Sequence, residues 1–230
     1  DYYYFQGTNE DSVIHYTNKV KEFAKATHQP KYYYFAWANR LITYYLKTSR
    51  TNIALYEVQN MLKEAQEEDD KTGLSRCYNI MSQIYTIKRF DSMAFEWRLK
   101  EIELTEKYKI ENYNISQTYA QIANYYINQK KQKEALAAVE KAIATANSST
   151  QQISAKLEFV NYYSKFGDFQ AAEKLLKECQ AAFEQDKRLE SIKKRLYNIE
   201  CLYYQQTKQY PKALEAAKMQ EKEERRLSES

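Results

Sequence analysis

The fold is decided by two stretches, YAQIANYY (Tyr119–Tyr126) and EALAAVEKA (Glu134–Ala142), which are joined by a polar turn. Small residues, Ala123 in the first stretch and Ala135 in the second, stand among larger apolar ones. Two antiparallel helices can approach closely only where small side chains face each other. The two stretches therefore predict a hairpin of two α-helices that cross at these alanines.

The same pattern returns along the chain at nearly constant intervals. A small residue opens each predicted second helix, and successive markers are 42, 40, 41, 37 and 41 residues apart. Five similar intervals are hard to obtain by chance, so an internal repeat is favoured over a generic helical bundle. The markers are Ser12, Ala54, Ala94, Ala135, Ala172 and Ala213.

These units resemble the tetratricopeptide repeat (TPR), strongly over residues 113–219 and more weakly before them. The resemblance implies an all-α fold, a right-handed α-solenoid of antiparallel helix hairpins with about five to six degenerate repeats. Standard units repeat every ~34 residues, so each hairpin should carry about one to two extra helical turns. We expect a single domain over 1–230, with a truncated first repeat over 1–28 and a charged terminal helix over 212–230.

The composition excludes several classes of protein. Three glycines and two prolines leave few places for tight turns, so a β-rich fold is not expected. The 23 tyrosines suit a thin helical layer, because each ring can be buried while its hydroxyl reaches water. Acidic and basic residues are interleaved, which predicts solvated helix faces and no nucleic-acid site. No apolar run approaches the ~18 residues of a membrane span, so no membrane insertion is expected.

No motif for catalysis, for a cofactor or for a metal is recognised in the sequence. There is no glycine-rich phosphate loop, no HExxH and no GxSxG. Cys77, Cys179 and Cys201 form no CxxC pair, and with only His15 and His28 beside them they make no plausible zinc site. The cysteines are expected to be buried small hydrophobic residues. We expect this chain to have no enzymatic activity, and any kinase domain would lie outside it.

The TPR resemblance also implies a concave groove lined by the first helices of successive hairpins. Amide side chains recur there, and because an amide both donates and accepts, a row of them can pair with the backbone of an extended peptide. Arginines near the same surface are expected to contact carboxylates. The alternative is that the amides only keep a solvated face soluble. The expected peptide-binding residues are Asn39, Asn79, Gln83, Asn124, Asn128, Asn161, Lys165, Asn198, Arg76 and Arg195. Replacing Asn124 and Asn161 together by alanine is expected to leave the thermal midpoint nearly unchanged.

These features predict a non-enzymatic module that binds a protein or peptide in the groove. Degenerate tyrosine- and lysine-rich TPR arrays resemble the extracytoplasmic input domains of bacterial sensor histidine kinases and related transmembrane regulators. That resemblance implies a sensory module of a two-component system, located in the periplasm. The alternatives are the TPR domain of a cytoplasmic peptide-responsive transcription regulator and a structural assembly adaptor. Homodimer formation is left open.

Overall fold

The computed structural model describes residues 9–228, and every regular element in that range is helical. The helices form two compact units, unit 1 (Asp1–Glu111) and unit 2 (Asn112–Ser230). The prediction of an all-α chain of helical hairpins is confirmed. The single domain expected over 1–230 stays a prediction, and part of the expected truncated repeat, residues 1–8, lies outside the described range.

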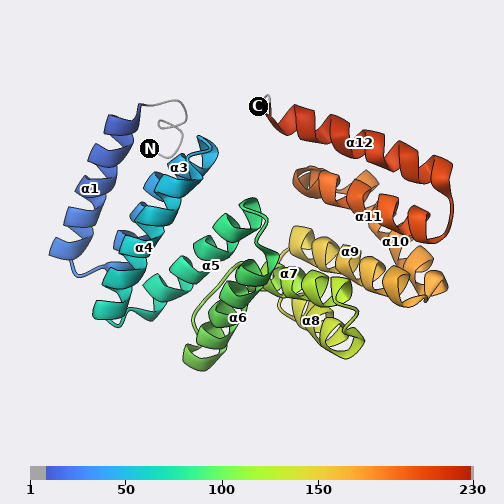
Figure 1. Ribbon diagram of the computed structural model, residues 1–230, viewed down its shortest axis with the longest axis horizontal. Coiled ribbons are helices and arrows are strands. Elements are labelled where there is room, and N and C mark those ends of the chain that lie inside the picture. The colour runs from blue at the N-terminus through green and yellow to red at the C-terminus, as the bar shows by residue number, and fades with distance from the viewer. Residues whose placement is uncertain (1–8, 229–230) are drawn as a thin grey trace. The chain divides into compact units, whose positions relative to one another are not determined.

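Unit 1 is a run of antiparallel helices joined by short turns (Figure 1). Its elements are α1 (Glu10–Ala26), α2 (Pro30–Ala36), η2 (Trp37–Ile42), α3 (Thr43–Lys47), α4 (Thr51–Glu67), α5 (Lys71–Ile87) and α6 (Asp91–Tyr108). α2, η2 and α3 form one helix that pairs with α4, and α5 pairs with α6. The π-helical turn η2 in the middle of this first helix is not predicted by the sequence.

Unit 2 contains three hairpins, α7 with α8, α9 with α10 and α11 with α12. Its elements are α7 (Ile115–Asn128), α8 (Gln132–Ala144), α9 (Ser149–Phe166), α10 (Phe169–Gln185), η3 (Lys187–Ile192), α11 (Lys193–Gln206) and α12 (Tyr210–Ser228). The first helices are neighbours, because α9 packs against both α7 and α11. The charged terminal helix predicted over 212–230 is α12, which packs on α11 through buried Ala213 and Ala216.

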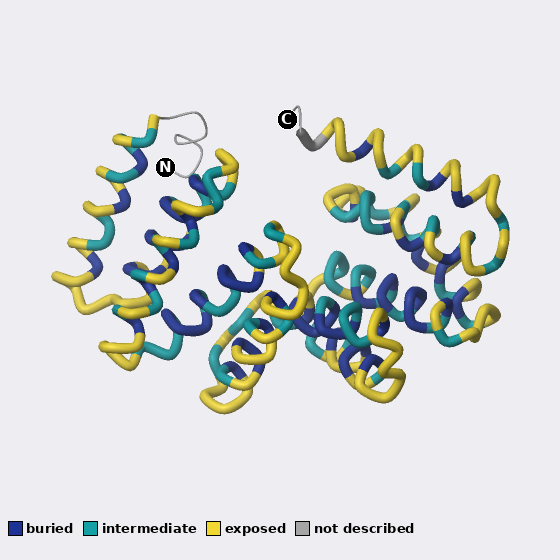
Figure 2. The backbone as a smooth tube through the Cα atoms, viewed as in Figure 1, coloured by how far each residue is buried: buried dark blue, intermediate teal, exposed yellow. Residues whose placement is uncertain are grey.

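Small residues lie at the helix crossings, as the repeat predicts. The alanine markers Ala54, Ala94, Ala135 and Ala172 are at most 1% exposed. Each lies in the first turn of a second helix, and Figure 2 shows buried residues along one side of the helices. Because these sites have no spare volume, a larger side chain there would push the paired helices apart.

Most turns between helices use one three-residue connection. In the turn between α7 and α8, Lys130 has a φ of 58°, and its N–H donates to the carbonyl of Ile127. The N–H of Lys131 then donates to the carbonyl of Tyr126, which completes a Schellman motif. The equivalent left-handed residues in other three-residue turns are His28, Ser49, Asp69, Arg89 and Lys208, and Gly167 is left-handed in the two-residue turn between α9 and α10.

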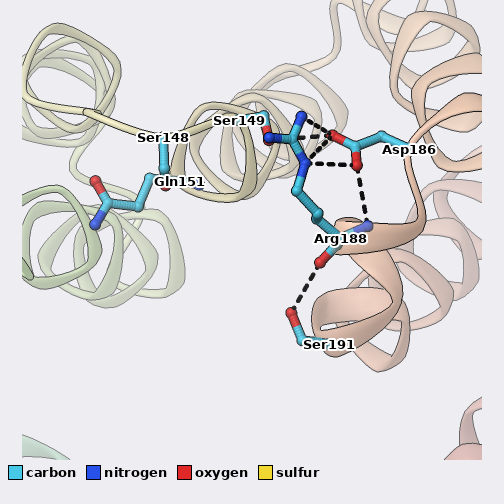
Figure 3. Close-up of polar contacts among 6 residues, drawn as sticks. All are labelled: Ser148, Ser149, Gln151, Asp186, Arg188 and Ser191. Carbon is cyan, nitrogen blue, oxygen red and sulfur yellow. Dashed lines mark hydrogen bonds and ion pairs between the residues drawn. The ribbon is translucent and has the colours of Figure 1, made fainter.

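A polar cluster ties the link between α10 and α11 to the start of α9 (Figure 3). The Oδ1 atom of Asp186 accepts hydrogen bonds from the backbone N of Arg188 at 3.0 Å and from its Nε at 2.9 Å. The Oδ2 atom accepts from Arg188 Nη2 at 2.8 Å and from the Ser149 hydroxyl at 3.1 Å. Ser148 caps α9 by accepting from the backbone N of Gln151. These contacts fix the direction of the chain between the second and third hairpins.

Candidate functional site

The structure places all ten predicted groove residues on first helices. Asn39 lies in η2, and three of the residues lie on α5. The other six lie on α7, α9 and α11, two on each helix. The α5 residues are Arg76, Asn79 and Gln83, and those of unit 2 are Asn124, Asn128, Asn161, Lys165, Arg195 and Asn198.

In unit 2 a buried carboxylate brings several of these residues together. Glu158 lies on α9, and only 1% of it is exposed. Its Oε1 atom accepts hydrogen bonds from Asn124 Nδ2 at 3.1 Å and from Asn161 Nδ2 at 2.8 Å. Its Oε2 atom accepts from Arg195 Nη2 at 2.7 Å, which is also an ion pair. We call these four residues the Glu158 network, and it joins all three first helices of the unit.

The network changes the expected role of the two asparagines. A buried carboxylate is tolerated only when it is paired and hydrogen-bonded, so Asn124 and Asn161 stabilise the fold by donating to Glu158. Asn161 is itself buried. We therefore correct the expectation that replacing both by alanine leaves the thermal midpoint unchanged. The double replacement removes two of the donors to Glu158 and should lower the midpoint.

Three other residues of unit 2 form an exposed rim beside the network. Asn128, Lys165 and Asn198 are exposed, and each follows a network residue by three or four positions on its helix. That spacing puts them on the same helix face as the network. Asn128 Nδ2 donates to Asn124 Oδ1 at 3.1 Å, so the amides form a chain that leads from the surface to Glu158.

Unit 1 contains a similar chain of amides. Gln83 Nε2 donates to Asn79 Oδ1 at 2.6 Å, and Asn79 Nδ2 lies 3.2 Å from each carboxylate oxygen of Glu101. Glu101 lies on α6 and is 1% exposed. In both units, an exposed amide thus contacts a second amide four residues away, which in turn contacts a buried glutamate.

The two predicted arginines differ in their surroundings. Arg195 is paired with Glu158, whereas the guanidinium of Arg76 lies over the ring of Phe35, 5.4 Å from its centroid. Arg76 is half-buried, and its Nε is buried without a hydrogen-bond partner among the described residues. Burial lowers the pKa of the Arg76 guanidinium. Among the predicted residues, Arg76 is thus a cation held beside an aromatic ring and not beside a carboxylate.

Sequence reasoning missed the two glutamates that organise both surfaces. A signal for Glu158 is present, because it stands inside the apolar run Leu157–Val160 on a first helix. A carboxylate within such a run is a candidate for burial, and a buried carboxylate requires donors from neighbouring helices. The repeat frame shows which residues face the groove, but it does not show which of them already donate to one another.

The remaining polar candidates are consistent with structural roles. Cys77 and Cys179 are fully buried and Cys201 is half-buried, so the prediction of buried cysteines is confirmed for the first two. Burial raises the pKa of both buried thiols to about 12.

Over residues 9–228, no three His, Cys, Asp or Glu side chains come together in a way that could hold a metal ion. No helix in that range combines the length and the apolar composition needed to cross a bilayer.

Comparison with known proteins shows the fold. No protein-family model and no curated protein matches the sequence. The structure is similar to BtubC (BKLC) from P. vanneervenii, with a TM-score of 0.66 at 15% identity, over 96% of this chain and 92% of that one. It is also similar to TPR-like repeats of a kinesin light chain from Podosopora anserina, with a TM-score of 0.58 at 14% identity, over 85% of this chain and 97% of that one. The chain therefore has a TPR-like repeat fold, as predicted.

Proposed function

We propose that this chain is a non-enzymatic module that binds an extended segment of a protein or peptide along its first helices. The observation that carries the proposal is the pair of amide chains anchored on buried glutamates. An amide that donates to a fixed carboxylate has a fixed orientation, so it meets a ligand without first losing conformational freedom. The outer amides, Asn128 and Gln83, retain donors and acceptors for a peptide backbone.

The rim of unit 2 provides the test. Random dodecapeptides displayed on phage would be selected on the immobilised chain, and a selected peptide would be labelled for fluorescence anisotropy. Replacing Asn128, Lys165 and Asn198 by alanine should weaken binding by roughly tenfold or more, since several ligand hydrogen bonds are lost. The thermal midpoint should hardly change, because all three side chains are exposed.

A matched control lies on the second helices of the same unit. Gln132, Gln170 and Lys174 are exposed on α8 and α10, so their replacement by alanine removes two amides and one lysine away from the rim. Binding that survives in the control and fails in the rim variant supports the proposal. Equal losses in the two variants, or a loss in neither, would place the ligand elsewhere.

The finer assignments rest on the TPR resemblance and on the sequence. The role as input module of a sensor histidine kinase, with a periplasmic location, stays a prediction, as do the regulator and adaptor alternatives. Sequence flanking this chain in its gene separates them. A membrane span after Ser230 would select the sensor, an N-terminal helix-turn-helix would select the regulator, and neither feature would favour the adaptor.

A further inference from the structure

We propose that the rings of Trp37 and Tyr33 form a cage in unit 1 that binds a quaternary ammonium group, and that the Lys21 side chain occupies this cage in the free chain. The cage is independent of the proposed peptide binding, because none of its residues belongs to the predicted groove residues or to the rim. The ammonium group would belong either to a small molecule such as choline or to a trimethylated lysine of a protein. The choice of probe separates these two sources.

The two rings form perpendicular walls around one ammonium ion. Tyr33 on α2 and Trp37 at the start of η2 are four residues apart, so they share a helix face. Their ring planes meet at 88°, and their centroids are 6.0 Å apart. Lys21 of α1 places its Nζ atom 3.2 Å from the Trp37 centroid and 4.8 Å from the Tyr33 centroid. At both distances a cation is attracted to an aromatic face.

Two carboxylates of α4 hold the walls in place. Trp37 Nε1 donates to Glu57 at 2.9 Å, and the Tyr33 hydroxyl donates to Glu64 at 2.6 Å. Both rings are also buried, so their orientation does not depend on Lys21. Walls that are already fixed lose little conformational freedom when a ligand enters. The negative charges at the ring edges favour a cation between the rings.

Lys21 fits this cage only in part. Its ammonium has N–H donors, and none of them donates to a protein acceptor or lies in an ion pair among residues 9–228. Lys21 is half-buried, and burial lowers the pKa of its ammonium, although the charges of Glu64 and Glu57 act in the opposite direction. The ammonium thus loses hydration that the cage does not replace. A quaternary ammonium has no N–H donor to satisfy, so the same cage suits it better.

The side chain of Lys21 can leave the cage without the unfolding of α1. Its four-carbon stem is flexible, so rotation of the side chain moves the ammonium into water and restores its hydration. Beside the cage, a cavity of about 210 Å³ shares the Tyr33 wall and is also lined by Lys25, Pro30 and Glu68. The charge of Lys25 is balanced by Glu64 at 2.9 Å. The cavity therefore gives room for the remainder of a small ligand without repelling its positive group.

The fluorescence of Trp37 in the full chain measures binding. The chain has two tryptophans, so Trp97→Phe leaves Trp37 as the reporter. At constant ionic strength, choline should change this fluorescence in a saturable way. Its uncharged isostere 3,3-dimethyl-1-butanol should not, because the cage selects positive charge. In the same background, Lys21→Ala should bind choline at least about tenfold more tightly, since no side chain has to be displaced.

Two further variants control this measurement. Lys19 is an exposed lysine of α1 whose Nζ atom lies 5.9 Å from the Tyr16 centroid, outside the cage. Lys19→Ala should therefore keep the choline affinity of the parent chain. Glu57→Gln keeps a hydrogen-bond acceptor for Trp37 but removes the charge, so it should weaken choline binding to Lys21→Ala by roughly threefold or more. Circular dichroism establishes that each variant is folded, and Lys21→Gln replaces Lys21→Ala if the alanine variant is not.

A peptide that carries one trimethyllysine is the second probe. If the peptide binds more tightly than choline and its unmethylated form does not bind, the ammonium group belongs to a protein ligand. If choline binds more tightly, the ligand is a small molecule. Either result supports the cage.

Three results would overturn the proposal. The first is a fluorescence signal that choline does not change in a saturable way, or that the uncharged isostere changes equally. The second is an equal choline affinity of Lys21→Ala and Lys19→Ala. The third is binding by Lys21→Ala with none by the parent chain at concentrations about a hundredfold above the Kd of that variant, because Lys21 would then be a permanent part of the fold.

Discussion

The carboxylate of Glu158 accepts hydrogen bonds from donors on three helices, so the removal of one donor should destabilise the folded chain. Replacing Arg195 by Met keeps much of the apolar stem but leaves the carboxylate with only two amide donors. We expect the free energy of unfolding to fall by about 2–3 kcal/mol, somewhat less than for a fully buried pair because Arg195 is partly exposed. Urea denaturation of wild type and variant measures this difference.

A second replacement provides the control for that prediction. Glu158→Gln added to Arg195→Met removes the buried charge but keeps an oxygen that can accept from Asn124 and Asn161, so much of the lost stability should return. A double variant that is as unstable as Arg195→Met would show that the arginine acts through packing and not through the Glu158 charge.

The stability of unit 2 should decrease at low pH because of Asp186. The side chain of Arg188 is the main cause that lowers the pKa of Asp186 from 3.8 to about 2, and the Arg188 backbone and Ser149 add hydrogen bonds in the same direction. Because the folded chain holds this proton less tightly than the unfolded chain, the stabilisation is present above pH 4 and is lost as pH falls towards 2.

The variant Asp186→Asn tests this predicted direction of the pH dependence. Its thermal midpoint should lie below that of the wild type at pH 7, and the two midpoints should converge between pH 4 and pH 2. Scanning calorimetry at these pH values measures the difference. A gap that stays constant across this range would mean that the Asp186 contacts in Figure 3 do not depend on its charge.

At the scale of the helix, the turns store a small strain that glycine would relieve. Lys130 is held at a φ of 58°, a conformation that costs residues with a Cβ roughly 1–2 kcal/mol. Glycine at this position avoids the cost but is more flexible in the unfolded chain, so Lys130→Gly should stabilise by about 0.5–1 kcal/mol. Thermal denaturation followed by circular dichroism is the measurement.

A glycine substitution at an exposed position inside a helix should have the opposite effect on stability. Ala137 is exposed inside α8, and Ala137→Gly should destabilise by about 1 kcal/mol, the usual cost of glycine in a helix interior. If both glycine variants lost stability, the left-handed conformation of Lys130 would not be a source of strain.

The sequence predicts elements better than it predicts contacts between elements. Ala135 and Ala172 identify second helices in the sequence, because every repeat needs a small side chain at this position. The π turn η2 escapes prediction, because its residues Trp37–Ile42 follow an ordinary apolar pattern. The Glu158 network escapes for a different reason: its members are 34 and 37 positions apart, and only the packing of three helices makes them meet.

At the scale of the whole chain, the question is whether the two units are independent. Each has a core of its own, which runs from Val13 to Ile84 in unit 1 and from Leu157 to Tyr203 in unit 2. A unit with its own core can fold alone. We therefore expect residues 112–230, produced as a separate fragment, to show a helical circular dichroism spectrum and a cooperative thermal transition.

The Glu158 network makes this prediction more specific, because all four of its residues belong to unit 2. If the fragment folds as in the full chain, Arg195→Met should lower the unfolding free energy of both by the same amount, within about 0.5 kcal/mol. A fragment that unfolds, or that no longer responds to Arg195→Met, would show that unit 1 supports the network. The single domain expected from the repeat pattern would then describe the chain better than two units do, since in a repeat array each hairpin depends on the hairpins beside it.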